Sequence, residues 1–384
     1  MTGARAVALV DGEHYPEVVR HALAALPYEW VGAILVGGAE KLRGEPDYGV
    51  PLVDGFDGAV VVVDLSDEPV LGPADRMRWA SRALAEGLSY VGVDFRFDPP
   101  QLEPFALPSI SVIGTGKRVG KTAVTGHLAR LLARDRSVVV VAMGRGGPSE
   151  PEVVAEPPTL DDLLARSRAG RHAASDHLET AAVCGVPTIG CRRAGGGLAG
   201  AVGFSNVSEG ARLAAERAPD VVVFDGSGAA IPPVATDRRI LVVGARQDAD
   251  AYLNTYRRLI SDLVVAVDCD VADAVRVHLR LRATEPLTGR VAVFTAGGSE
   301  VSHLDAEVVH ASTNLANRPA LARELEGVDA DTYLVEVKAA AIDLVAEHAV
   351  ARGRRVVLAA NDVVAVDADL DAALLELAPE KTAA

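Results

Sequence analysis

The residues with the clearest chemical meaning in this sequence are Gly114–Ala123. They read Gly-Thr-Gly-Lys-Arg-Val-Gly-Lys-Thr-Ala, and they follow the apolar run Ser109–Ile113 and precede a helix-like pattern. Glycines at such positions let backbone N–H groups turn inward around phosphate oxygens. Lys121 can then reach the β- and γ-phosphates, and the Thr122 hydroxyl can ligate Mg²⁺. The stretch therefore predicts a P-loop that binds ATP and Mg²⁺, with Thr115 where the usual motif has its first glycine.

The loop is a variant of the usual P-loop. It is similar to the loop of dethiobiotin synthetase and the MinD-like ATPases, whose signature lysine would fall at Gly116. Lys117 and Arg118 lie beside that position, so we expect them to supply a catalytic charge. The predicted nucleotide contacts are Gly114, Thr115, Gly116, Lys117, Arg118, Val119, Gly120, Lys121, Thr122 and Ala123.

A P-loop also needs an acid that organises the metal ion. Asp225 ends the apolar run that begins at Asp220, which is the position expected for such an acid, and we predict that it acts with Lys121 in catalysis. The candidate Mg²⁺ ligands are Thr122, Asp225 and Asp176, with Glu179 as a further candidate. Two other interpretations stay open: Asp225 begins a turn, and Asp176 caps the helix that follows it.

Three stretches before Asp225 carry basic side chains or histidines close to glycines or to the end of an apolar run. The predicted ligands of a second anion site next to ATP are Arg145, His172, His177, Arg192 and Arg193. Arginine suits bidentate phosphate contacts, and ligands of open α/β sheets bind at the carboxyl ends of the strands. The alternative is that the arginines are solvated and that the histidines have only a structural role.

The first hundred residues contain a third group of acids and bases. Asp11 and Asp64 both end apolar runs, so we expect them to share one edge of a sheet. We predict that this region covers the substrate, with His14, Arg76 or Arg78 touching it. The alternative is a domain that serves stability or dimerisation.

Short β-branched runs alternate with helix-like patterns along the chain. Val60–Val63 and Val138–Val141 are apolar without alternation, which is typical of parallel strands covered on both faces. The pattern predicts the α/β class, with an N-terminal α/β domain followed by a P-loop NTPase domain that has a mainly parallel sheet. Asp98–Pro108 contains four prolines in eleven residues and marks a boundary. The predicted division is domain 1–100, linker 101–108 and domain 109–384.

The composition excludes several classes of protein. A formal charge of −15 disfavours binding to nucleic acid or to an anionic membrane surface. No apolar stretch approaches the roughly 18 residues of a membrane span. Three cysteines in 384 residues do not form a disulfide framework, and they lack the spacing of a zinc site. We therefore expect a cytoplasmic protein with a small-molecule substrate and no nucleic-acid or membrane partner.

Eleven stretches spread along the chain form a pattern far more specific than a P-loop alone. They are Asp11–Tyr15, Gly37–Lys41, Asp64–Pro69, Arg76–Ser81, Gly114–Ala123, Ala142–Pro148, His172–His177, Gly190–Gly197, Gly226–Pro233, Asn317–Pro319 and Lys338–Ala341. In this pattern the chain resembles the cyclic 2,3-diphosphoglycerate synthetase family. It departs from the family pattern at Asp225, where the family has Glu, and at Ala194, where the family has a second Cys.

The resemblance implies a ligase that joins the two phosphates of 2,3-diphosphoglycerate into an intramolecular anhydride, using ATP and Mg²⁺ and releasing ADP and phosphate. The similarity of its loop to that of the dimeric P-loop class predicts a homodimer. The alternative enzyme is a 2-phosphoglycerate kinase, or another small-molecule kinase or ligase on the same scaffold. A non-enzymatic ATP switch of the MinD or metallochaperone kind is disfavoured, because the sequence has neither a membrane-binding helix nor a Cys/His metal motif.

Overall fold

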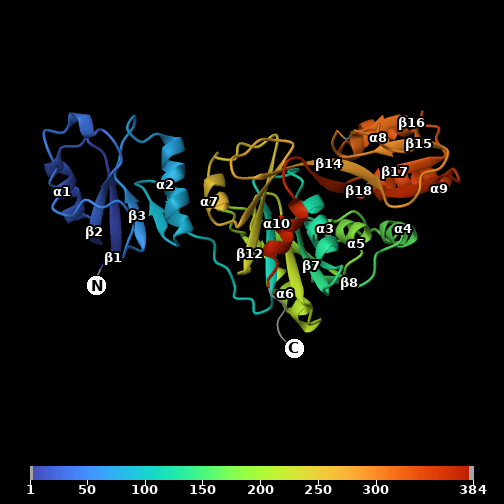
Figure 1. The fold of residues 1–384 in the computed structure, drawn as a ribbon, viewed down its shortest axis with the longest axis horizontal. Coiled ribbons are helices and arrows are strands. Elements are labelled where there is room, and N and C mark those ends of the chain that lie inside the picture. Colours follow the sequence, from blue (N-terminus) through green and yellow to red (C-terminus); the bar gives the residue numbers. More distant parts are fainter. Residues whose placement is uncertain (1–2, 299, 380–384) are drawn as a thin grey trace. The chain divides into compact units, whose positions relative to one another are not determined.

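The computed structural model describes residues 3–298 and 300–379 and divides the chain into two compact units (Figure 1). The first unit contains the chain up to Gln101, together with Leu198–Ala201 and Asp248–Ile260. The second unit contains the remaining described residues.

The first unit is a small α/β layer. Its elements are β1 (Ala4–Val10), α1 (Pro16–Ala25), β2 (Tyr28–Leu35), η1 (Ala39–Lys41), β3 (Val61–Asp64), α2 (Pro73–Ala85), β4 (Ser89–Val91), β5 (Arg96–Phe97) and α7 (Asn254–Leu259). The strand order is β2-β1-β3-β4-β5, and every neighbouring pair is parallel except β4 with β5. Leu9 pairs with Asp64, so Asp11 and Asp64 lie at the same carboxyl edge of the sheet.

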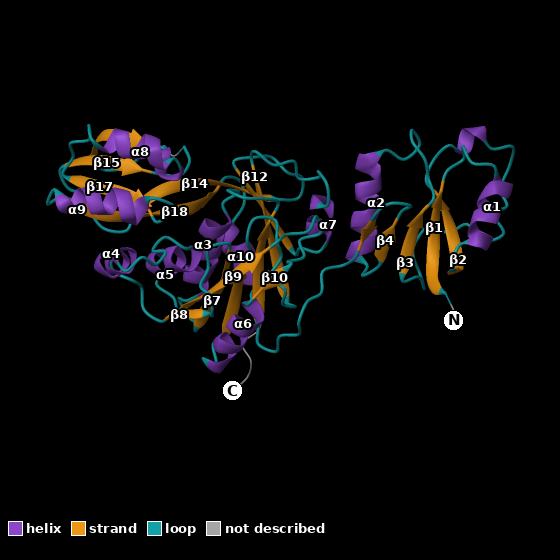
Figure 2. Cartoon of the chain, turned by 180° about the vertical axis from the view of Figure 1, so that it is seen from behind, coloured by secondary structure: helices purple, strands orange, loops and turns teal. Residues whose placement is uncertain are grey.

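The second unit is built on one long sheet with helices on both faces (Figure 2). Its strands are β6 (Ser109–Gly114), β7 (Val138–Gly144), β8 (Glu152–Val154), β9 (Thr188–Ala194), β10 (Phe204–Ser205), β11 (Val221–Asp225), β12 (Arg238–Gly244), β13 (Leu263–Val267), β14 (Val275–Ala283), β15 (Arg290–Phe294), β16 (Glu307–Ser312), β17 (Thr332–Glu336) and β18 (Arg355–Ala365). Its helices are α3 (Lys121–Leu132), α4 (Leu160–Arg168), α5 (Asp176–Cys184), α6 (Val207–Glu216), η2 (Asn314–Ala316), α8 (Arg318–Leu325), the π-helix η3 (Ala341–Ala346), α9 (Glu347–Ala351) and α10 (Leu370–Leu377).

The strand order of this sheet is β10-β9-β7-β11-β6-β12-β13-β14-β18-β17-β15-β16, with β8 paired to β9. The antiparallel pairs are β10 with β9, β8 with β9 and β14 with β18, and the other pairs are parallel. The prediction of an N-terminal α/β domain followed by a P-loop domain with a mainly parallel sheet is therefore confirmed.

Continuous apolar strands form the core around β6 because both faces of the sheet are covered. In β7, Val138 and Val140 belong to a cluster with Leu128 of α3, whereas Val139 and Val141 belong to a cluster with Ala211 of α6. Each of these side chains is buried. This double coverage explains why β7 has no alternation of polar and apolar residues.

The sequence analysis missed β14, which is an alternating strand. Val277 and Leu281 are buried, whereas His278 and Arg280 on the opposite face are exposed. A search for uninterrupted β-branched runs overlooks such a strand, although a period of two is itself a strand signal.

The end of β9 also differs from the prediction. The sequence analysis placed Arg192 and Arg193 close to the end of an apolar run, but β9 continues to Ala194, so both arginines are strand residues. The extension is held by β10, in which Ser205 pairs with Arg193. Since neighbouring residues of a strand point to opposite faces, the two arginines cannot point the same way.

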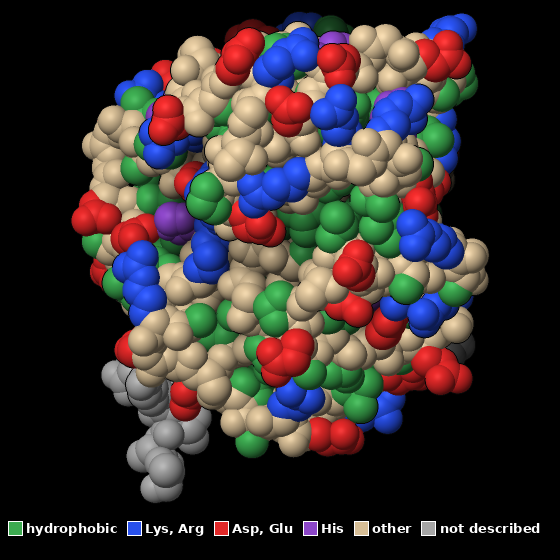
Figure 3. Space-filling model, turned by 90° about the vertical axis from the view of Figure 1, so that its right-hand side faces the viewer, with side chains coloured by type: hydrophobic (Ala, Val, Ile, Leu, Met, Phe, Trp, Pro, Cys, Tyr) green, Lys and Arg blue, Asp and Glu red, His purple; other side chains and the backbone are tan. Residues whose placement is uncertain are grey.

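Acidic and basic side chains are interspersed on the face of the molecule drawn in Figure 3, without a continuous patch of one sign. Among the helices that the structure describes, none is long and apolar enough to cross a membrane.

Candidate active site

The glycine-rich loop joins β6 to α3 and therefore lies at the carboxyl edge of the sheet. Gly120 has a φ of 93° and Arg118 a φ of 63°, both in the left-handed region. A Cβ on Gly114 would lie 2.8 Å from Cδ of Lys121 and 2.9 Å from Cγ2 of Val119, so a larger residue does not fit there. Because α3 begins directly after the loop, its free N–H groups and its dipole favour an anion at this point.

Lys121 is a buried cation among other charges. The residue is only 8% exposed. Burial lowers the pKa of the Lys121 ammonium group. The negative charges of Asp225 and Asp176 raise this pKa, whereas the positive charges of Arg145 and Arg193 lower it further. Three basic side chains thus share one electrostatic environment, which an anion would stabilise.

Asp225 lies at the carboxyl end of β11, in register with Val112 of β6. It is 3% exposed, and Oδ1 accepts a hydrogen bond of 3.1 Å from Oγ1 of Thr125. Burial raises the pKa of Asp225 to about 7, and the charge of Lys121 opposes that rise. The carboxylate is therefore next to both the P-loop strand and the P-loop lysine.

Asp176 is the first residue of α5, and Ser175 holds the N-cap position. Its Oδ2 lies 3.2 Å from where a Cβ on Gly144 would be, which places it beside the end of β7. Its side chain is exposed, and among the described residues the structure gives it no hydrogen bond or ion pair. With Asp225 and the partly exposed Thr122, it offers oxygen ligands of the kind that Mg²⁺ prefers.

A cavity of about 390 Å³ lies beside these charges, at the carboxyl ends of β7, β9 and β11. It is lined by Arg145, Arg193, Gly195, Gly196, Gly197, Ala229 and Ala230. Nη2 of Arg145 lies 2.9 Å, and Nη2 of Arg193 3.3 Å, from where a Cβ on Gly228 would be. The two guanidinium groups therefore converge on Gly228, whose φ of 62° also favours glycine.

Arg193 is fixed by backbone carbonyl groups. Nη2 donates to the Ser227 carbonyl at 2.7 Å, and Nη1 donates to the Gly195 carbonyl at 2.8 Å. Its buried Nε has no hydrogen-bond partner among the described residues. Burial and the neighbouring charge of Arg145 lower the pKa of Arg193. An oriented guanidinium that lines a cavity is suited to a phosphate ligand.

Arg192 points elsewhere, as expected for the next residue of a strand. Nε donates to the Pro148 carbonyl at 2.6 Å, and the backbone N–H is held by Oδ1 of Asn206 at 2.7 Å. Arg192 is not among the residues that line the cavity. The structure thus brings Arg145 and Arg193 together, whereas Arg192 holds the loop that contains Pro148.

The two histidines occupy different environments. His177 is 2% exposed, and its ring packs against Gly190, where a Cβ would lie 2.4 Å from the ring Cγ. Nδ1 lies 3.1 Å from Oγ of Ser175, Nε2 lies 3.5 Å from Oε2 of Glu152, and burial lowers the pKa of the ring. His172 is exposed, and its Nδ1 accepts from the N–H of Ala174 at 3.2 Å. Of the pair, His172 is the accessible one.

Lys117 and Arg118 are both exposed at the tip of the glycine-rich loop. Within the described part of the chain, the structure gives neither side chain a hydrogen bond or an ion pair. Their charges are therefore available to a ligand or to a second protein chain.

The predicted residues of the first unit lie around the edge marked by Asp11 and Asp64. Nδ1 of His14 lies 2.9 Å from Oδ1 of Asp11, and Nε of Arg76 donates to Oδ2 of Asp64 at 3.0 Å. Arg78 is paired with Asp75 at the surface of α2. His14 and Arg76 therefore have fixed positions at this edge of the sheet.

Comparison with known proteins shows which family this chain resembles. Three family models match: the N-terminal domain of cyclic 2,3-diphosphoglycerate synthetase over residues 5–98, its P-loop domain over 109–285 and its C-terminal domain over 297–362. A protein of Rubrobacter xylanophilus named cyclic 2,3-diphosphoglycerate synthetase is 47% identical, with 97% of each chain covered.

The chain belongs to the cyclic 2,3-diphosphoglycerate synthetase family. Relatives with the same name from Thermococcus gammatolerans and Thermococcus kodakarensis are each 40% identical and cover 94% and 97% of this chain. The resemblance inferred from the eleven sequence stretches is thereby confirmed. A solved structure of LpxK from Aquifex aeolicus in complex with ATP aligns over 73% of this chain and 91% of that chain, with 14% identity and a TM-score of 0.44.

Two neighbours of the family's P-loop were missed in the sequence analysis. A Cβ on Gly116 would lie 2.8 Å from Oε1 of Gln247, which follows β12 in the stretch Gly244-Ala-Arg-Gln247. Gly228 forms the floor under the two arginines. Both lie just beyond the carboxyl ends of strands that flank β6, and that position is the signal by which they could have been found.

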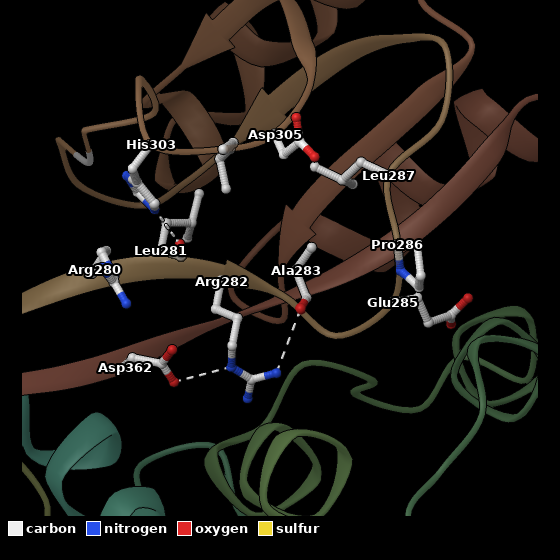
Figure 4. A pocket seen from close by; sticks show the side chains of 11 residues that line it. Arg280, Leu281, Arg282, Ala283, Glu285, Pro286, Leu287, His303, Asp305 and Asp362 are labelled. Atoms are coloured by element: carbon white, nitrogen blue, oxygen red, sulfur yellow. Dashed lines mark hydrogen bonds and ion pairs between the residues drawn. The ribbon is translucent and has the colours of Figure 1, made fainter.

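A second cavity, of about 440 Å³, lies between β14 and the loops that follow it (Figure 4). Arg282 donates through Nε to Oδ1 of Asp362 at 3.0 Å, and Nε2 of His303 lies 2.6 Å from the Leu281 carbonyl oxygen. None of the residues predicted for the active site lines this cavity. Arg282 and His303 are each held by another residue of the lining, and we do not assign this cavity to the reaction.

Proposed function

We propose that this chain converts 2,3-diphosphoglycerate into cyclic 2,3-diphosphoglycerate in an ATP- and Mg²⁺-dependent reaction that releases ADP and phosphate. The observation that carries the proposal is the convergence of Arg145 and Arg193 on a cavity next to Lys121 and Asp225. This pairing of an anion pocket with a P-loop occurs in a chain of the cyclic 2,3-diphosphoglycerate synthetase family.

The glycine-rich loop Gly114–Ala123 would hold the phosphates of ATP, and Lys121 would contact the β- and γ-phosphates. The Thr122 hydroxyl, Asp225 and Asp176 would hold Mg²⁺. The described residues contain no group of three or more His, Cys, Asp or Glu side chains arranged to hold a metal ion. One hydroxyl and two carboxylates nevertheless fit Mg²⁺, because this ion keeps several waters and binds through one or two carboxylates and substrate phosphates. When bound, Mg²⁺ neutralises charge on the phosphate oxygens.

Arg145 and Arg193 would hold one phosphate of the substrate, with the accessible His172 as a further proposed contact, whereas Arg192 and the buried His177 would act only by positioning the site. Two phosphates on one small molecule repel each other, so bringing them together needs fixed cations. Arg193 supplies a guanidinium whose orientation is set by the Ser227 and Gly195 carbonyl groups.

The reaction needs two displacements at phosphorus. An oxygen of one substrate phosphate attacks the γ-phosphorus of ATP, a P–O–P bond forms and ADP leaves. An oxygen of the other phosphate then attacks the substrate phosphorus of that anhydride, the ring closes and the former γ-phosphate leaves as phosphate. Lys121, Lys117 and Arg118 would stabilise the charge of the transferring group, so that positioning and charge provide the catalysis.

Three broader assignments belong to the same proposal. The enzyme would work in the cytoplasm, where ATP and phosphorylated acids are available and where the three free cysteines stay reduced. It would act as a homodimer, since its loop resembles those of dimeric P-loop proteins. His14, Arg76 and Arg78 of the first unit would contact the substrate.

A phosphorus NMR time course with 2,3-diphosphoglycerate, ATP and Mg²⁺ tests the proposal. The two phosphomonoester signals should be replaced by upfield anhydride signals while ADP and phosphate accumulate. The same experiment with 2-phosphoglycerate tests the alternative enzyme, because a kinase would produce a second phosphomonoester signal and no phosphate. Conversion of 2-phosphoglycerate but not of 2,3-diphosphoglycerate would replace the synthetase proposal with the kinase.

A further inference from the structure

Lys338 lies at the carboxyl end of β17, in a part of the second unit far along the chain from the P-loop. Its neighbours Val337 and Ala340 are fully buried, in a cluster that also contains Leu178 of α5. Ala339 has a φ of 45°, in the left-handed region. The buried neighbours therefore fix the backbone position of Lys338 next to α5.

Two carboxylates hold the ammonium group of Lys338. Nζ lies 3.4 Å from Oε1 of Glu179 and 3.9 Å from Oε1 of Glu336. Glu336 is itself fixed, because Oε1 accepts from Nδ2 of Asn361 and Oε2 accepts from the N–H of Ala296, each at 2.8 Å. The side chain of Lys338 is 36% exposed, whereas those of Glu179 and Glu336 are 12% and 8% exposed. Lys338 is therefore the least buried of the three side chains.

The cluster is connected to the active site through α5. Glu179 lies three residues after Asp176 on this helix, so the two side chains lie on the same face. The charge of Asp176 contributes to raising the pKa of both Lys338 and Lys121. Lys338 and Lys121 therefore both interact electrostatically with the exposed Asp176, although they lie in different parts of the second unit.

We propose that Lys338 is a further substrate-binding cation of this active site, which donates to a phosphate oxygen of the acidic substrate beside Asp176 while Glu179 and Glu336 orient it. This inference rests on the proposed function. Each phosphate monoester carries about −1.5 to −2 at neutral pH, and the substrate also has a carboxylate. Arg145 and Arg193 supply two positive charges at the cavity, and Lys338 would add a third cation for the second phosphate.

The test compares Lys338→Met and Lys338→Arg with the control Arg168→Met. Arg168 of α4 forms a bidentate pair with Glu347 of α9 at 2.7 and 2.9 Å, so its loss also removes a cation that joins distant segments. We expect Lys338→Met to raise the KM for 2,3-diphosphoglycerate, or to lower kcat, by roughly 10- to 150-fold. The Kd for ATP should change less than about 2-fold, Lys338→Arg should recover part of the loss, and Arg168→Met should resemble wild type.

Unchanged KM and kcat in Lys338→Met would overturn the inference and make the cluster structural, whether or not the melting temperature falls. An equal loss of substrate and ATP affinity would also overturn it, because Lys338 would then act on the whole site. A wild-type protein that forms no cyclic product would count against the proposed function instead. In that case, titration of inorganic phosphate into the protein with ADP and Mg²⁺ still decides the inference, which requires weaker phosphate binding in Lys338→Met than in Arg168→Met.

Discussion

The guanidinium groups of Arg145, in the turn after β7, and of Arg193, in the neighbouring strand β9, both lie close to Gly228. Their Nη2 atoms lie 2.9 and 3.3 Å from where a Cβ on that glycine would be. Gly228 follows Asp225 by three residues, so the turn that holds the proposed metal ligand also forms the floor of the anion pocket. One short turn thereby connects the proposed nucleotide site to the proposed substrate site.

Gly228→Ala should weaken binding of 2,3-diphosphoglycerate by about 10-fold or more, because the new Cβ displaces both guanidinium groups. A left-handed backbone also disfavours alanine, which should cost roughly 1–2 kcal/mol of stability. Gly170→Ala is the matched control, since Gly170 has a φ of 72° and open space around its Cα. Calorimetric titration should show the loss of substrate affinity in Gly228→Ala alone, and equal losses in both variants would attribute the effect to backbone strain.

Arg193→Ala should reduce the affinity for 2,3-diphosphoglycerate or the turnover by roughly 10- to 150-fold. Arg193→Lys should recover only part of this loss, since an ammonium cannot make the bidentate contact. Arg192→Ala should affect the substrate less, because its Nε donates to the Pro148 carbonyl. Titrating ATP and substrate separately against each variant checks this order. If Arg192→Ala costs more substrate affinity than Arg193→Ala, the assignment of the pocket is wrong.

Lys121→Met should abolish turnover and leave the melting temperature close to that of wild type. The methionine keeps an apolar stem over Gly114 but cannot contact the phosphates. Lys121→Ala should lose the same activity and also some stability, because it leaves the space above Gly114 empty. Turnover near the wild-type rate in either variant would remove the P-loop from the mechanism.

Asp225 should make the metal-free protein less stable as the pH rises. Burial raises its pKa to about 7 from an ordinary value of 3.8, so between these values the folded state binds a proton that the unfolded chain has lost. Stability contributed by this group therefore falls as pH rises through that window. Asp225→Asn cannot ionise, so without Mg²⁺ and nucleotide its melting temperature should improve relative to wild type between pH 5 and pH 8. A difference that stays constant with pH would show that Asp225 is already ionised.

The sequence was sufficient for features that depend on local pattern. The P-loop, the position of Asp225 and the buried parallel strands all follow from apolar runs that end in glycine or an acid. The direction of Arg192 and Arg193 could not be predicted, because it depends on how far β9 extends, and that depends on pairing with β10. The sequence analysis likewise gave no sign that Lys338 lies near Asp176. These two residues are far apart in the chain, and they are brought into electrostatic range by the packing of α5 against the end of the sheet.

The central claim is that a substrate phosphate, and not water, receives the γ-phosphoryl group of ATP. The direct measurement uses 2,3-diphosphoglycerate whose phosphoryl oxygens are labelled with ¹⁸O, followed by mass analysis of the phosphate released during cyclisation. The proposed steps transfer the bridging oxygen from the substrate to the leaving phosphate, so each released phosphate should carry one ¹⁸O atom and ADP should carry none. Unlabelled phosphate accompanying the formation of cyclic product would contradict the account.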